Sequence, residues 1–141
     1  MSIVQSVAEL KERLNRDGND LDAAIALGNI FYDNNDVPQS ILFYQRALAI
    51  NPDMSGVRTD LGTMYWRNND IALSEQAFRE VIQRDPSFGH AYVNLGLLLH
   101  RARNNVAEAR AVWQKLLDVN PGHEVAGKAR ELLYETASLM N

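Results

Sequence analysis

Apolar residues along the chain recur at intervals of three and four, the spacing that places side chains on one face of an α-helix. Within residues 21–54 the pattern appears twice, first around Leu27 and Phe31 and then around Ile41 and Tyr44. Polar residues separate the two segments. The pattern therefore predicts two amphipathic helices joined by a short turn.

This helix pair is repeated along the sequence. A Leu-Gly pair occurs three times, each copy 34 residues after the previous one, and several other columns recur with it. The columns are Phe31, Tyr65 and Leu99; small residues Ser40, Ser74 and Ala109; aromatic residues Tyr44, Phe78 and Trp113; and closing prolines Pro52, Pro86 and Pro121. Two chance recurrences of one dipeptide alone have a probability on the order of one in ten thousand. The chain therefore contains three repeated units, 21–54, 55–88 and 89–123.

The residues between the predicted helices fit this organisation. Turn formers stand between the two helices of each unit, and the last of them is expected to cap the second helix: Asp36, Asp70 and Asn105. The glycine of each Leu-Gly pair lies inside a helix, where it costs about 1 kcal/mol relative to alanine. A packing reason is therefore expected, namely close approach of a neighbouring helix.

Two further amphipathic segments flank the units. Residues 3–15 carry Ile3, Val7, Leu10 and Leu14 on one face, and residues 124–139 carry a similar apolar stripe. Both segments are predicted to be helices, and they are expected to cover the open apolar faces of the end units, as stacked repeats require.

These motifs resemble the tetratricopeptide repeat, a helix-turn-helix unit of 34 residues. The resemblance implies an all-α solenoid of three repeats in a right-handed superhelix. The chain is expected to form a single domain, residues 1–141, with residues 1–20 and 124–141 as the N-terminal and C-terminal capping helices. One column departs from the family, because its usual tryptophan is replaced by Ala24, Arg58 and Tyr92.

The same resemblance implies a binding groove lined by the first helix of each unit. The polar and aromatic residues at the matching positions are Asn29, Tyr32, Asp33, Thr59, Asp60, Thr63, Trp66, Arg67, His90, Asn94, His100 and Arg101. Tyr32, Trp66 and His100 occupy one column and are expected to follow one another along the inner face. Arg67 and Arg101 stand beside this column, a combination that suits an acidic or carboxylate-bearing peptide.

Chaperone-binding members of the family hold a C-terminal carboxylate with a clamp of Lys, Asn, Asn, Lys and Arg. The matching positions here are Ile25, Asn29, Asp60, His90 and Asn94. One asparagine is retained and no cation, and Asp60 would repel a carboxylate. This ligand mode is therefore not expected.

Composition limits the classes of partner. The chain has 14 Lys plus Arg against 18 Asp plus Glu, a net charge of -4, which would repel a nucleic acid backbone. No apolar run approaches the roughly 20 residues that cross a bilayer, so no membrane insertion is expected. The absence of cysteine fits a reducing compartment. A cytoplasmic location is expected for a complete chain, and a periplasmic or membrane-anchored parent stays open for a fragment.

No catalytic constellation stands out, so the chain is not expected to be an enzyme or to need a cofactor. The glycines are single and helical, unlike those of a phosphate-binding loop. The three histidines, His90, His100 and His123, are expected on different repeats or faces, so no metal site is predicted.

Two functions remain after these exclusions. The first is a scaffold or adaptor that binds a protein or peptide in the groove. The second is a structural or assembly role, either through homo-oligomerisation or as the soluble part of a larger complex. Residues 113–121 resemble repeats of bacterial assembly factors, including cytochrome c maturation proteins.

Overall fold

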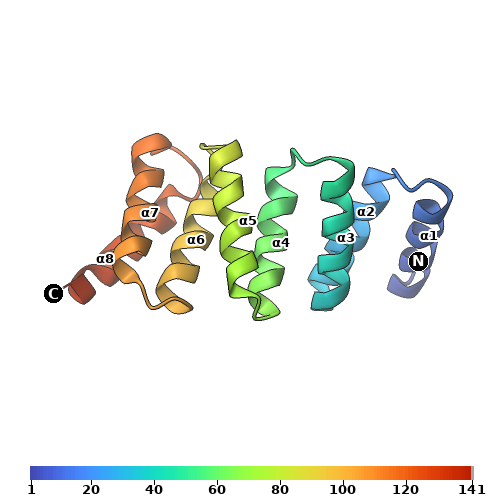
Figure 1. Ribbon diagram of the computed structural model, residues 1–141, viewed down its shortest axis with the longest axis horizontal. Coiled ribbons are helices and arrows are strands. Elements are labelled where there is room, and N and C mark those ends of the chain that lie inside the picture. The colour runs from blue at the N-terminus through green and yellow to red at the C-terminus, as the bar shows by residue number, and fades with distance from the viewer. Residues whose placement is uncertain (141) are drawn as a thin grey trace. The chain divides into compact units, whose positions relative to one another are not determined.

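The computed structural model describes residues 1–140, and these residues form eight α-helices, one short 3-10 helix and no strand (Figure 1). The prediction of an all-α chain is confirmed. The helices fall into two compact units, one ending at Asp70 and the other beginning at Ile71. This boundary lies inside the second predicted repeat, between its two helices.

The first unit contains four helices. These are α1 (Ile3–Arg16), α2 (Leu21–Asp33), α3 (Val37–Ile50) and α4 (Ser55–Arg67). Each packs against the next in chain order. Their apolar faces meet in one buried cluster, which includes Leu14, Leu27, Phe43, Tyr44, Leu61 and Met64. Leu14 of α1 is 1% exposed, so the N-terminal helix covers the apolar face of α2 as predicted.

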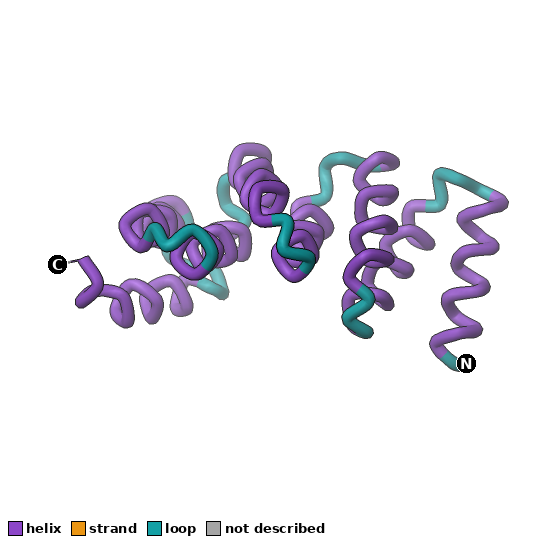
Figure 2. The backbone as a smooth tube through the Cα atoms, turned by 60° about the horizontal axis from the view of Figure 1, so that its bottom comes forward, coloured by secondary structure: helices purple, strands orange, loops and turns teal. Residues whose placement is uncertain are grey.

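The second unit continues the same pattern. It contains α5 (Ile71–Arg84), α6 (Gly89–Arg101), α7 (Val106–Val119), α8 (Ala126–Thr136) and the 3-10 helix η1 (Ala137–Met140). Here α6 packs on α5 and α7, and α8 packs on α7 and on α6. The predicted C-terminal helix begins two residues later than expected, because residues 121–125 form turns. Short loops connect the helices within each unit (Figure 2).

The turns inside the repeats have a common geometry that explains their asparagines. Asn35, Asn69 and Asn104 have positive φ angles of 56°, 61° and 54°. Asparagine tolerates this left-handed conformation better than most residues. At the first and third of these turns the next residue caps the following helix: Asp36 accepts from Gln39 N–H, and Asn105 accepts from Glu108 N–H.

The helical glycines give room to aromatic rings. A Cβ atom on Gly28 would overlap the ring of Tyr44, and one on Gly96 would overlap the indole of Trp113. Both rings are almost fully buried. The small-residue column contributes as well, since the hydroxyl of Ser40 donates to the Gly28 carbonyl at 2.9 Å. The predicted close approach is therefore confirmed at these two glycines.

In the column of Ala24, Arg58 and Tyr92, the two long side chains make the same kind of polar contact, a hydrogen bond to a proline carbonyl. The Tyr92 hydroxyl donates to the Pro86 carbonyl at 2.7 Å, and the Arg58 guanidinium donates to the Pro52 carbonyl at 2.8 Å. The two prolines are themselves one repeat apart. A long cation can therefore replace an aromatic hydroxyl at this position because both reach the carbonyl that ends the preceding unit.

Candidate functional site

A polar and aromatic surface lies where the C-terminal turns of α2 and α4 meet in the first unit. The guanidinium carbon of Arg67 is 5.0 Å from the centroid of the Tyr32 ring, within the range of a cation–π interaction. Arg67 is exposed and Tyr32 is partly buried. The Tyr32 ring also packs edge to face with the ring of the buried Tyr44, with ring centroids 6.4 Å apart.

Asn29 and Asp60 complete this surface. The Tyr44 hydroxyl donates to Oδ1 of Asn29 at 2.5 Å, which fixes the orientation of the amide. Burial raises the pKa of Tyr32, the negative charge of Asp60 raises it further, and the Arg67 charge opposes both. Burial and the Asp60 charge likewise raise the pKa of Tyr44. Both phenols are therefore neutral hydrogen-bond donors near pH 7.

The remaining residues predicted on this face of the first unit differ in accessibility. Thr59 is only 4% exposed, and its hydroxyl donates to the Ser55 carbonyl of the preceding turn at 2.8 Å. Thr63 is partly buried and its hydroxyl donates to the Thr59 carbonyl at 3.3 Å. Trp66 is also partly buried, whereas Asp33 is exposed. Thr59 is therefore omitted from the surface defined below.

We use the name α2–α4 surface for the accessible members of this group. They are Asn29, Tyr32, Asp33, Asp60, Thr63, Trp66 and Arg67. Sequence analysis predicted every one of them as a groove residue, but it paired Arg67 with Trp66. The structure shows Tyr32 under the cation instead. Consecutive side chains of an α-helix are rotated by about 100° around its axis. Arg67 therefore points toward α2, and Trp66 points in a different direction.

In the second unit the four predicted groove residues all lie on α6. Asn94 and His100 are partly buried, and Arg101 is exposed at the last turn of the helix. The His100 ring packs edge-on against Trp113, with centroids 6.5 Å apart. His90 lies in the first turn, and its Nε2 is 2.9 Å from Oε1 of Glu124.

The prediction that all three histidines lie on different repeats or faces is wrong for His90 and His123. Their rings pack edge to face with centroids 5.4 Å apart, and Glu124 lies beside them. The reason is the antiparallel pairing of α6 and α7, which returns the end of α7 to the start of α6. The sequence did contain a signal, because Glu124 follows His90 by one repeat period of 34 residues.

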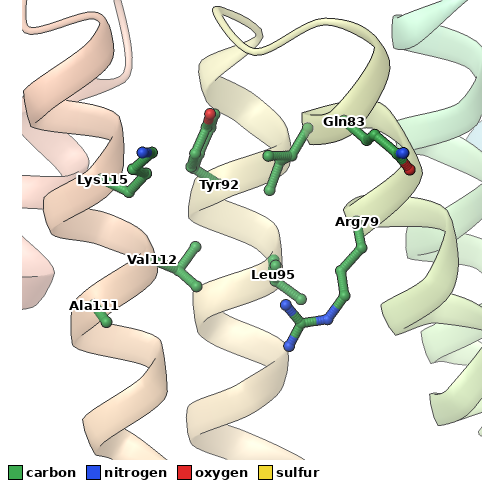
Figure 3. A pocket seen from close by; sticks show the side chains of 8 residues that line it. Arg79, Gln83, Tyr92, Leu95, Ala111, Val112 and Lys115 are labelled. Atoms are coloured by element: carbon green, nitrogen blue, oxygen red, sulfur yellow. The ribbon is translucent and has the colours of Figure 1, made fainter.

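Sequence analysis also missed a cavity of about 340 Å³ in the second unit. Side chains of α5, α6 and α7 line it, among them Ile82, Tyr92, Leu95 and Val112, with Lys115 at one edge (Figure 3). Arg79 lies at the opposite edge, where its guanidinium is already bound by Glu75 at 3.0 Å and by Glu108 at 2.5 Å. The cavity can receive an apolar group, but its lining holds no nucleophile paired with a base.

A family model described as "Tetratricopeptide repeat" matches residues 6–55 and 59–124. The chain belongs to the tetratricopeptide repeat family. This match confirms the resemblance seen in the Leu-Gly, aromatic and proline columns. Repeats of this family commonly mediate protein–protein interaction. A comparison with curated protein sequences finds no match.

Several solved structures share the tetratricopeptide fold with this chain. A crystal structure of MamA has a TM-score of 0.79 at 20% identity, covering 94% of this chain and 77% of MamA. The TPR2B domain of yeast Sti1, solved in complex with pHsp70, has a TM-score of 0.74 at 17% identity over 84% of this chain and 97% of that domain. PilF of Pseudomonas aeruginosa has a TM-score of 0.75 at 22% identity, over 96% of this chain and 62% of PilF. Identities this low establish the fold alone.

Among the residues that the structure describes, no helix has the length and apolar character needed to cross a membrane.

Proposed function

We propose that this tetratricopeptide chain is a non-enzymatic binding module that holds a peptide or protein segment on the α2–α4 surface. The observation that carries the proposal is the placement of Arg67 over the Tyr32 ring, on side chains that are at least partly accessible. Arginine, tyrosine and tryptophan are the residue types that contribute most to binding at protein interfaces. Here arginine and tyrosine are in contact on a fold that commonly binds proteins, and we expect Trp66 beside them from the repeat register.

The surface is held in shape before a ligand arrives. Tyr32 packs between Arg67 and the buried Tyr44, and Asn29 is fixed by the Tyr44 hydroxyl. Side chains already ordered in this way lose less conformational entropy on binding than mobile ones. The arrangement therefore favours recognition of a defined segment over loose association.

The charges indicate what such a segment carries. Arg67 offers one cation for a carboxylate of the ligand, as expected from the sequence. Asp60 and Asp33 place two negative charges near Tyr32, since both raise its pKa. The surface therefore suits an apolar or aromatic segment with one acidic group opposite Arg67 and a donor or cation opposite Asp60, and it does not suit a uniformly acidic peptide.

The test is a pull-down from cells of the source organism with wild type beside Arg67→Glu, both quantified by mass spectrometry. A matched control is Arg46→Glu, an exposed arginine on α3 outside the α2–α4 surface. The proposal predicts a set of proteins that wild type and the control retain and Arg67→Glu loses. Equal recovery by all three chains would refute it.

A second candidate, assembly through the ends of the chain, has its own observation. Large apolar side chains are exposed on α1, where Ile3 and Val4 are 56% and 79% exposed, and near the C-terminus, where Tyr134 is 86% exposed. Exposed apolar patches often mark association surfaces. Size-exclusion chromatography with light scattering tests this candidate, which predicts a dimer or larger species that Val4→Glu or Tyr134→Glu returns to monomer.

A further inference from the structure

Three metal-ligating side chains converge at one end of the second unit. His90 comes from the first turn of α6, and His123 and Glu124 come from the turn that precedes α8. One potential ligand atom from each of the three lies within 4.8 Å of the others. His90 and Glu124 are in direct contact, with 2.9 Å between Nε2 and Oε1.

The turn that carries two of these side chains is fixed by its own contacts. The Asn120 amide donates to the Ser87 carbonyl at 2.9 Å, which ties the end of α7 to the loop before α6. The His123 ring packs directly on Gly89, where any Cβ atom would overlap it. Val125 N–H donates to Nδ1 of His123 at 3.1 Å and orients the ring. These contacts hold the His123 ring in place, and His90 and Glu124 reach it from accessible positions.

We propose that His90, His123 and Glu124 bind one divalent transition-metal ion of the Zn²⁺ class. Two imidazoles and one carboxylate form a donor set that zinc uses in three-ligand sites, with the remaining position left to water. Imidazole nitrogen also selects against Mg²⁺ and Ca²⁺, which prefer oxygen ligands. The site goes beyond peptide binding on the α2–α4 surface, and it connects the start of α6 with the turn that leads into α8.

The movement required is small. Zinc–ligand distances of about 2.1 Å in a tetrahedral site place neighbouring ligand atoms about 3.4 Å apart. The His90–Glu124 contact of 2.9 Å therefore opens slightly, and the widest separation of 4.8 Å closes by about 1.4 Å through side-chain rotation. The Glu124 side chain is 76% exposed and the His90 side chain 44% exposed, so both can turn without disturbing the core. Coordination by His123 through either nitrogen replaces its hydrogen bond from Val125 N–H.

The experiment is calorimetric titration of the untagged, chelator-treated chain with Zn²⁺, with Mg²⁺ as the control ion. Variants are His90→Ala and Glu124→Gln, both at accessible side chains, and His100→Ala is the control because this histidine packs on Trp113 outside the cluster. Circular dichroism checks that every variant is folded. Loss of even an outer contact of a metal site costs about 10–100-fold in affinity, so loss of a ligand is expected to cost at least tenfold.

The proposal predicts one Zn²⁺ per chain, no Mg²⁺ binding, affinity at least tenfold weaker in His90→Ala and Glu124→Gln, and unchanged affinity in His100→Ala. Zn²⁺ is also expected to raise the melting temperature of wild type more than that of either variant. Titration up to about 1 mM Zn²⁺ detects any site with a Kd below about 1 mM. Absence of binding to wild type in that range would overturn the proposal. Equal affinity in wild type and His90→Ala would overturn it too, because the ion would then bind elsewhere.

Discussion

The guanidinium of Arg67 lies 5.0 Å from the centroid of the Tyr32 ring, joining two positions that are almost one repeat apart in the sequence. Tyr32 lies in the last turn of α2 and Arg67 is the last residue of α4, so the contact spans the first helices of two successive tetratricopeptide repeats. Equivalent helix ends of successive repeats lie side by side. Arg67 follows Tyr32 by one residue more than the repeat period of 34, so it reaches the Tyr32 ring from the next repeat. The contact is the structural basis for the proposed binding surface.

The first prediction concerns the glycine under Tyr44. Gly28→Ala is expected to lower the free energy of unfolding by about 1–3 kcal/mol, since the added methyl overlaps a buried ring that has little room to move. The control is Gly127→Ala in α8, where nothing lies within 4 Å of the added Cβ atom and helix propensity favours alanine by up to about 1 kcal/mol. Urea unfolding of both variants measures the difference. A stabilised Gly28→Ala would mean that the ring is not held against this helix.

The second prediction concerns the left-handed turn residue Asn35, whose φ angle is 56°. Asn35→Ala is expected to destabilise the chain by about 1 kcal/mol, because alanine keeps the Cβ atom that approaches the following carbonyl oxygen but lacks the polar side chain that lets asparagine adopt this conformation. Asn35→Gly serves as the matched control and is expected to be neutral or slightly stabilising, since glycine adopts positive φ freely. Thermal unfolding of the pair distinguishes a conformational effect from loss of the amide. Equal destabilisation by both substitutions would show that the side chain matters instead.

These two positions show what the sequence could and could not reveal. Gly28 and Asn35 recur at the repeat period, so their structural roles were predictable from the pattern alone. The contact of Arg67 with Tyr32 was not, because a column shows which residues share a face but not which neighbours across two helices touch. The cluster of His90, His123 and Glu124 was missed for a similar reason, since two of its members belong to a turn with no helical period.

The third prediction uses the ion pairs of Glu75. Burial acts to raise the pKa of this carboxyl, but hydrogen bonds from Arg79 and Arg103 outweigh burial and lower it. A lowered folded-state pKa gives stability that is present above the unfolded value and is lost as the pH falls through the folded value. Glu75→Gln is therefore expected to be less stable than wild type by about 1 kcal/mol at pH 7, after allowing for partial exposure, and the difference should shrink as the pH falls below the ordinary glutamate pKa and through the lowered folded value.

Melting temperatures measured between about pH 3 and pH 7 test this prediction, because the ordinary glutamate pKa lies in that interval. Glu131→Gln is a suitable control, since Glu131 forms an exposed pair with Lys128 and such pairs contribute little. A Glu75→Gln difference that stays constant over the whole range would rule out the ionised carboxylate as its source.

The fourth prediction is negative. A peptide ending in Glu-Glu-Val-Asp is not expected to bind at micromolar concentration, because Asn29 is the one clamp residue that this chain shares with chaperone-binding relatives and Asp60 adds a negative charge. Fluorescence polarisation with a labelled peptide measures the affinity directly. Asp60→Asn is the informative companion variant, since removing the charge should strengthen any residual binding. Micromolar affinity for wild type would show that another cation replaces the clamp.

The most direct test of the proposed function is the affinity of a partner recovered by pull-down for wild type, Trp66→Ala and Arg67→Glu. Interface anchors of these types contribute about 2 kcal/mol or more, so each variant is expected to bind about thirtyfold more weakly. The Arg67→Glu effect should also shrink as salt is raised, because the side chain is exposed. Arg46→Glu, at an exposed arginine on α3, should bind like wild type. All variants should keep wild-type helix content. The account would be contradicted if Trp66→Ala melted while its folded fraction still bound the partner normally, because Trp66 would then belong to the core.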